Sequence, residues 1–160
     1  MPLHFPMSLL YVSGDPLLTH AQFLAFGHNA RGRTELGIFE TELLNRYPAP
    51  FAAFRRQCKR GRIETGTFWL WRESTPNLAF LVIRESSVGA TRIRFVQSAM
   101  LGLARDYGFE RIQSIAIAPL GSDQEWTEIL RLLDSWLNSL PIPIIVYQTY
   151  LPGIQAAENL

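Results

Sequence analysis

Three segments rich in glycine and small polar residues could bind a phosphate, because each follows an apolar, strand-like run. They are Gly14-Asp15, residues 27–37 (GHNARGRTELG) and residues 119–125 (PLGSDQE). In open α/β sheets, ligands bind beyond the carboxyl ends of the strands. Glycines expose backbone N–H groups and a helix N-terminus adds partial positive charge, so such loops favour a phosphate without a lysine. Ordinary turns between strands and helices have the same composition, and both interpretations stay open at this point.

Other kinds of reactive centre have no pattern in this sequence. It contains no GxxxxGK[ST] phosphate loop, no GxGxxG dinucleotide fingerprint and no GxSxG nucleophile turn. The three histidines, His4, His20 and His28, are scattered, and with one cysteine they form no metal-ligand pattern. Cys58 lies in a basic segment, RRQCKR, that could lower a thiol pKa, but a buried inert thiol is the favoured interpretation because no histidine partner can be named. We expect no metal and no cofactor.

The composition is that of one folded domain. The chain has 160 residues, 48% of them hydrophobic and 18% charged, and a net charge of +1. This charge argues against binding nucleic acid by bulk attraction, while a local basic patch stays open. A single cysteine suits a reducing cytoplasm, and neither a membrane span nor a signal peptide is indicated. We expect one domain over residues 1–160, with a core at about 8–150 and a loose tail after Pro152.

Strand-like and helix-like segments alternate along the chain. Period-two and continuous apolar runs predict strands at residues 8–13, 23–26, 67–71, 78–83, 112–120 and 142–147. Apolar residues at spacings of three and four predict helices at residues 34–47, 50–61, 93–107 and 122–140. Continuous apolar strands are typical of a sheet covered on both faces. The order predicts an α/β fold, a three-layer α/β/α sandwich with a mixed, mostly parallel sheet.

These segments, taken in order, resemble the macrodomain family. The resemblance covers roughly residues 9–150 and is carried by YVSGDPL, FLAFGHNARGRTELGIFETELLNRYP, FRRQCKRGRIETGTFWLW, LAFLVIRESS, IQSIAIAPLG and IPIIVY. It is closest to the branch of terminal ADP-ribose glycohydrolases and of the antitoxin that reverses DNA ADP-ribosylation. The resemblance implies ADP-ribose, or ADP-ribosylated protein or nucleic acid, as the partner.

The resemblance also implies roles for individual residues. Asp15 matches the carboxylate that accepts a hydrogen bond from the adenine amino group, and Asn29 matches a polar position that reaches the distal ribose. The remaining matched positions are Gly37 and Ile38 at the end of the first ligand loop, Gly121 and Ser122 in the second, and Tyr147 beside the adenine pocket. Each also has a structural interpretation: Asp15 and Asn29 suit turns, Ser122 suits a helix cap, and Tyr147 suits a core.

Departures from the family pattern bear on catalysis. Glu35 stands where this branch has a glycine that lets the diphosphate approach, so it should weaken anion binding by about 1 kcal/mol or more unless it turns to solvent. Arg84 replaces the lysine that attacks the sugar, and a guanidinium cannot form a Schiff base. The second loop is shorter by about three residues, which leaves Asp123 as the nearest match to the acidic residue that assists catalysis.

Three functions are compatible with these residues. The first is a binding module for ADP-ribose or a related nucleotide that lacks lysine-based catalysis. The second is an ADP-ribosyl hydrolase with a different constellation, in which Asp123 or Glu125 orients a water. The third is a scaffold for nucleic acid or protein, suggested by basic residues near Trp69 and Trp71. That basic cluster comprises Arg55, Arg56, Lys59, Arg60 and Arg62, and a solvated helix face is the favoured interpretation because the near-neutral net charge gives no wider basic surface.

Overall fold

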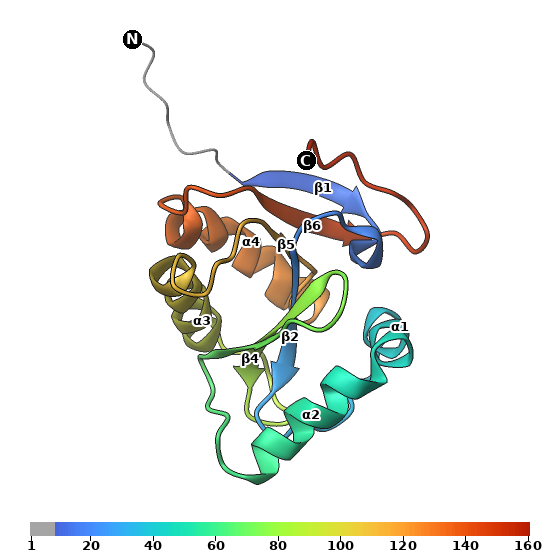
Figure 1. Cartoon of the computed structure of the whole chain (residues 1–160), viewed down its shortest axis with the longest axis vertical. Helices are drawn as coiled ribbons and strands as arrows, with labels where there is room; N and C mark the ends of the chain where they lie inside the picture. Colours follow the sequence, from blue (N-terminus) through green and yellow to red (C-terminus); the bar gives the residue numbers. More distant parts are fainter. Residues whose placement is uncertain (1–8) are drawn as a thin grey trace.

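A six-stranded mixed sheet runs through the middle of residues 9–160, the part of the chain described by the computed structural model (Figure 1). The strands are β1 (Leu10–Gly14), β2 (Phe23–Asn29), β3 (Phe68–Trp71), β4 (Asn77–Arg84), β5 (Ile115–Ile117) and β6 (Ile144–Tyr150). Their order across the sheet is β1-β6-β5-β2-β4-β3. Every neighbouring pair is parallel except β3 with β4, which confirms the mixed, mostly parallel sheet.

Helices cover both faces of the sheet. They are α1 (Ile38–Arg46), α2 (Pro48–Lys59), α3 (Ile93–Asp106) and α4 (Asp123–Leu137), with a short 3₁₀ turn, η1, at Pro16–Leu18. Figure 1 shows α1 and α2 on one side and α3 and α4 on the other, so the predicted α/β/α sandwich is confirmed. No helix of residues 9–160 is long and apolar enough to cross a membrane.

The core lies in two layers because strand residues alternate between the faces. On β4, Leu81 and Ile83 join the cluster beneath α3 and α4, whereas Phe80 and Val82 join the cluster beneath α1 and α2. All four of these side chains are fully buried. The continuous apolar run of β4 therefore reflects a strand covered on both faces. Together the two layers fix the carboxyl ends of β2, β4 and β5 at one edge of the sandwich.

Several boundaries differ from the sequence prediction; β2, for example, continues to Asn29 and β6 to Tyr150. The first helix begins at Ile38 rather than at residue 34, because residues 30–37 form a loop bound to the Asn29 side chain. The strand expected over residues 112–120 contains only Ile115–Ile117. The first strand begins at Leu10, and Ser8, included in the prediction, lies outside the described residues.

The tail after Pro152 differs from the loose segment that its composition predicts. Glu158 is only 5% exposed, and its carboxylate accepts hydrogen bonds from the Thr19 hydroxyl, the His20 backbone N–H and the Tyr147 hydroxyl. Ala156 is also buried. A buried carboxylate needs several donors to offset its lost hydration, and this one has three. The tail is therefore an integral part of the fold.

Candidate ligand-binding cleft

The ends of β2 and β4 bring the expected ligand position Asn29 beside Arg84, the residue that replaces the family's lysine. Their Cα positions pair across the parallel strands after a shift in register at His28, and the Ala30 N–H donates to the Arg84 carbonyl at 2.9 Å. The second loop, with Gly121, leaves the sheet from neighbouring β5. Parallel strands thus place both expected phosphate loops at one edge, as the sequence predicts.

An ion pair between Arg84 and Glu35 lies where the two loops meet. The Nη2 atom of Arg84 lies 2.7 Å from Oε1 of Glu35, and the two side chains are 10% and 12% exposed. The Nη1 atom donates to the Thr91 hydroxyl at 2.8 Å. The Nε atom is buried and has no hydrogen-bond partner among residues 9–160. Glu35 therefore turns toward the cleft rather than to solvent, and Arg84 keeps one donor unused.

Asn29 organises the first loop. It is fully buried, and its Oδ1 accepts from the backbone N–H groups of Arg31 and Arg33, both at 3.1 Å. Its Nδ2 donates to the Arg33 carbonyl at 2.9 Å and to the Glu35 carboxylate. Asn29 thus combines a turn-forming role with direct contact to the ion pair, since its amide donates to Oε2 of Glu35 while Arg84 donates to Oε1.

The second loop is tied to the first through Glu125. Ser122 caps α4, and Oε1 of Glu125 accepts from the Ser122 N–H at 2.8 Å to complete a capping box. Oε2 of Glu125 accepts from the Thr91 N–H at 3.0 Å. Burial alone would raise the pKa of Glu125, but these hydrogen bonds hold the pKa below its usual value. Glu125 is therefore ionised and structural.

Gly121 must be a glycine in this arrangement. Its φ is +78°, which L side chains rarely adopt, and an added Cβ would lie 2.6 Å from Glu125 Oε1 and 2.9 Å from the Thr91 hydroxyl. A chain of polar contacts consequently runs from Glu35 through Arg84 and Thr91 to Glu125, across the gap between the loops.

Side chains fill most of this gap. The space left among Gly27, Glu40, Arg84 and Gly121 is about 20 Å³, room for about one water molecule. The Glu40 carboxylate packs against Gly37, where even a methyl group would collide with it. Burial raises the pKa of Glu40, and the Glu35 charge adds to the effect. Two carboxyl groups, from Glu35 and Glu40, thus occupy the region where a diphosphate is expected.

The remaining expected residues lie elsewhere. Ile38, the first residue of α1, is 74% exposed. Asp123 is exposed in the first turn of α4, and its carboxylate makes no hydrogen bond or ion pair within residues 9–160. It lines neither this gap nor the larger hollow between α1 and α2, whereas the other acidic candidate, Glu125, is held in the capping box.

Asp15 and Tyr147 contact the C-terminal tail. The carboxylate of Asp15 accepts from the Leu17 N–H at 3.0 Å and from the Gly153 N–H at 2.8 Å, and the side chain is buried. The Tyr147 hydroxyl donates to Glu158. Burial, followed by the Glu158 contact, raises the pKa of Tyr147 far above its usual value. Two acceptor sites of the Asp15 carboxylate are therefore used by the chain itself, and about two remain.

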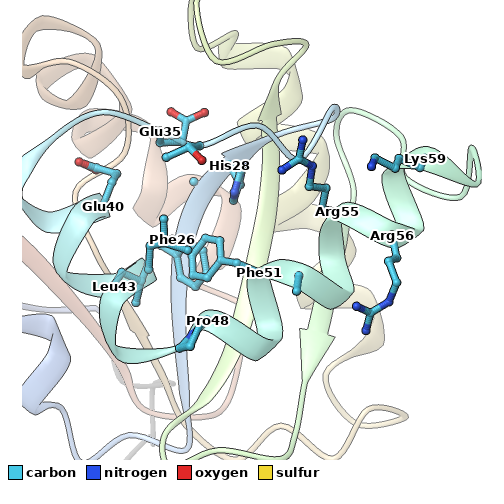
Figure 2. Close-up of a pocket in the computed structure, with 15 residues that line it drawn as sticks. Phe26, His28, Glu35, Glu40, Leu43, Pro48, Phe51, Arg55, Arg56 and Lys59 are labelled. Atoms are coloured by element: carbon cyan, nitrogen blue, oxygen red, sulfur yellow. The ribbon is translucent and has the colours of Figure 1, made fainter.

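A larger hollow between α1 and α2 was not anticipated from the sequence. Its volume is about 440 Å³, and Figure 2 shows carboxylates along its α1 side, basic side chains along α2, and aromatic rings at its floor. On α2 the lining residues recur at spacings of three and four, a signal that was available in the sequence. They are Pro48, Phe51, Ala52, Arg55, Arg56 and Lys59. The basic cluster of the sequence is thus in part the rim of a cavity.

His28 forms part of the floor of this hollow. It is 2% exposed and lies among the rings of Phe51, Phe54 and Phe80, with centroids 5.4, 5.1 and 5.8 Å away. Burial, aided by the Arg84 charge, lowers the pKa of His28 to about 3. Its Nδ1 accepts from the Asn29 N–H at 2.7 Å, so the neutral ring carries its proton on Nε2.

Neither a metal nor a reactive thiol is indicated. Residues 9–160 contain no group of three or more histidine, cysteine or acidic side chains that could hold a metal ion. Burial raises the pKa of the Cys58 thiol to about 11, so this group is protonated at neutral pH.

Comparison with known proteins shows which proteins this chain is similar to. No family model matches the sequence. Curated relatives at 23% identity are a DNA ADP-ribosyl transferase–DNA ADP-ribosyl glycohydrolase fusion protein of Thermosipho africanus and a DNA ADP-ribosyl glycohydrolase of Mycobacterium tuberculosis. The matches cover 95% and 87% of this chain but 45% and 42% of those proteins. The chain therefore spans less than half the length of the curated relatives it matches.

Solved structures agree with the sequence matches. The DarG macrodomain of Thermus aquaticus superposes with a TM-score of 0.79 at 21% identity, covering 87% of this chain and 97% of that one. The DarG macrodomain of Mycobacterium tuberculosis gives 0.78 at 22%, covering 91% and 98%. Thermosipho africanus DarTG, solved in complex with ADP-ribose, gives 0.79 at 21%, covering 91% and 42%.

The chain therefore has the macrodomain fold. Within that class it is similar to the DarG macrodomains, which confirms the resemblance predicted from its loops.

Proposed function

We propose that this chain is a macrodomain that binds ADP-ribose or a related ADP-ribosyl nucleotide and does not hydrolyse it by the lysine route. The observation that carries the proposal is the Arg84–Glu35 ion pair at the junction of the two loops. It supplies a cation suited to a diphosphate, and it replaces the amine that a Schiff-base mechanism needs.

Ligand binding in this proposal exchanges one anion for another. In the free protein, Glu35 neutralises Arg84 from within the chain. A diphosphate that displaces this carboxylate would meet the guanidinium, whose Nε is an unused buried donor. Gly121 would add an exposed backbone N–H at the same place. Because a buried donor without a partner is unfavourable, satisfying Arg84 contributes to ligand affinity.

The base end of the ligand is assigned to Asp15. Its carboxylate accepts two backbone hydrogen bonds, and about two acceptor sites remain for an adenine amino group. Residues 151–156 pass over the end of β1 here, since the Leu151 N–H donates to the Gly14 carbonyl and the Asp15 N–H to the Ile154 carbonyl. The tail would therefore form one wall of the base site.

Hydrolysis by a carboxylate is the alternative function, and the geometry supports it less. Glu125 is committed to capping α4 and to Thr91, and Asp123 is exposed outside the cavities. A general base must lie within hydrogen-bond reach of the water it activates. Neither Asp123 nor Glu125 therefore has an unengaged carboxylate beside Arg84.

Two assays on the wild-type protein test the proposal. Calorimetric titration with ADP-ribose should show binding, and backbone amide NMR signals of Asn29, Arg84 and Gly121 should move. Single-turnover incubation with ADP-ribosylated DNA or protein should release no ADP-ribose. Release that is lost in Asp123→Ala would establish the hydrolase alternative. Absence of binding in both the wild type and Glu35→Ala would overturn the proposal.

A further inference from the structure

The hollow between α1 and α2 has the size and the closed floor of a ligand site, and the proposed function does not use it. Its volume of about 440 Å³ lies within the range of small-molecule pockets. Its boundary includes the underside of the first loop at Gly32 and Thr34, whereas Asp15, Arg84 and Gly121 do not border it. It therefore adjoins the cleft that holds the Arg84–Glu35 pair: Glu35 lines the hollow, and Glu40 lines both spaces.

We propose that this hollow binds a nucleoside monophosphate whose base carries an amino group. The floor would stack on the base, the α1 side would accept from the amino group, and the α2 side would hold the phosphate.

The floor is a platform of aromatic rings, of which Phe51 is half-buried and Phe26 and His28 are each 2% exposed, so Phe51 offers the accessible face. Phe26 and Phe51 stack with centroids 5.7 Å apart, and the His28 ring lies 5.4 Å from Phe51. All three residues line the hollow. Every nucleobase has a flat π face, and base–aromatic stacking contributes to binding whatever the sequence of the base. An aliphatic ligand would make no comparable use of these rings.

His28 presents an unused hydrogen-bond donor to this platform. The side chain is 2% exposed, and its Nδ1 already accepts a hydrogen bond from the Asn29 N–H. The proton on Nε2 meets no acceptor among residues 9–160. Because Arg84 Nε is the buried side-chain donor without a partner in the described chain, His28 Nε2 is open to solvent in the hollow and available to an acceptor on a ligand. A ring nitrogen or a sugar hydroxyl of a nucleotide supplies one.

Charge is divided between the two walls of the hollow. Arg55, Arg56 and Lys59 lie at the basic end of α2, and none of them forms an ion pair within the described chain. Figure 2 shows Arg55 and Lys59 along α2, across the hollow from Glu40, whereas the Arg56 guanidinium points to the other side of the helix. Glu35 is already paired with Arg84, which leaves Glu40 as the acceptor of the α1 wall.

This division matches the ends of a nucleotide. A phosphate is drawn to the unpaired cations Arg55 and Lys59, and a guanidinium group binds it through parallel N–H donors. An exocyclic amino group donates and so suits the carboxyl of Glu40. The apolar start of the α2 face, Pro48, Phe51 and Ala52, lies between these ends and beside the platform. The amino and phosphate ends of a nucleotide would thus each face a suitable wall.

Amide NMR titration of the full chain tests the site with three probes. We expect AMP to shift signals of Phe51, Ala52 and Arg55 at millimolar concentration or below. Adenosine, which lacks the charge, and inorganic phosphate, which lacks the ring, should each bind at least about tenfold more weakly. A short adenine-containing single strand, run in parallel, distinguishes a free nucleotide from one within a chain, and binding of either through these residues supports the site.

Matched variants locate the binding. Replacing Arg55 and Lys59 with alanine should weaken AMP binding by about tenfold or more. Replacing Arg60 and Arg62 with alanine removes the same amount of charge from the same basic segment, but outside the hollow. This variant should change AMP affinity little. Ala52→Trp, which fills the hollow without altering charge, should abolish binding.

Three results would overturn the proposal. The first is no shift with either AMP or the single strand. The second is inorganic phosphate binding as tightly as AMP, which would mean an adventitious anion site. The third is equal loss in the Arg60/Arg62 variant, which would mean diffuse charge attraction. The Arg55/Lys59 variant leaves Asp15 and Arg84 unchanged, so it should lose AMP binding at the hollow and keep ADP-ribose binding in the adjoining cleft, which distinguishes failure of one proposal from failure of the other.

Discussion

Removing the Glu35 carboxylate should tighten ADP-ribose binding. In the structure this group lies 2.7 Å from Arg84 and is 12% exposed, so a bound diphosphate would have to displace it and would also be repelled by it. Two unit charges 4–5 Å apart at an effective dielectric constant of 20 interact by about 3–4 kcal/mol. Salt and residual solvent reduce this, and we expect a gain of about 1–3 kcal/mol. That corresponds to an affinity about 5- to 150-fold higher.

The assay is calorimetric titration of ADP-ribose into wild type, Glu35→Ala and Glu35→Gln. The glutamine variant removes the charge but keeps the bulk, so its affinity should lie between the other two. Glu64→Gln, which removes an exposed carboxylate outside the cleft, serves as the matched control and should behave as wild type. Urea unfolding of each variant checks that the unpaired Arg84 has not unfolded the domain.

Two outcomes would refute this reasoning. Equal affinity of Glu35→Ala and wild type would show that the carboxylate does not compete with the ligand. Weaker binding by Glu35→Ala in a folded protein would show that Glu35 itself contacts the ligand, for instance by accepting from a ribose hydroxyl.

Further predictions concern stability and loop geometry. Because the pKa of His28 is near 3 when folded and near 6.5 when unfolded, the free energy of unfolding should fall as pH drops below 6.5, by up to about 1.4 kcal/mol per pH unit. His28→Asn should flatten this slope and His20→Asn should not, as urea melts at several pH values would show. Glu158→Gln should destabilise the domain by about 1–3 kcal/mol, since the amide replaces an ionised acceptor of three hydrogen bonds, and chemical denaturation measures it. Gly121→Ala should lower both stability and ADP-ribose affinity, because φ is +78° and the methyl group would meet Glu125; thermal melts and titration check it.

The architecture could be predicted from the sequence because its signals are local and strong. The continuous apolar run of β4 and the three- and four-residue spacing of α4 each identify an element by themselves. Their order then limits the topology to few alternatives. The residues that flank the cleft follow from the same logic, since parallel strands bring Asn29 and Arg84 to one edge.

What the sequence could not supply are contacts between distant side chains. Glu35 was recognised as a departure, but its pairing with Arg84, 49 residues away, depends on the path of the first loop. The burial of Glu158 likewise depends on a contact with Thr19, and the polar composition of the tail gives no sign of this contact. The sequence indicates a cluster of basic residues on and after α2, but it does not show the hollow that Arg55, Arg56 and Lys59 line.

A structure of the protein with ADP-ribose tests the central claim most directly. We expect the diphosphate to lie within hydrogen-bond distance of the Arg84 guanidinium and the Gly121 N–H, and the Glu35 carboxylate to have moved away from Arg84. A ligand bound elsewhere, with Glu35 still paired to Arg84, would contradict it.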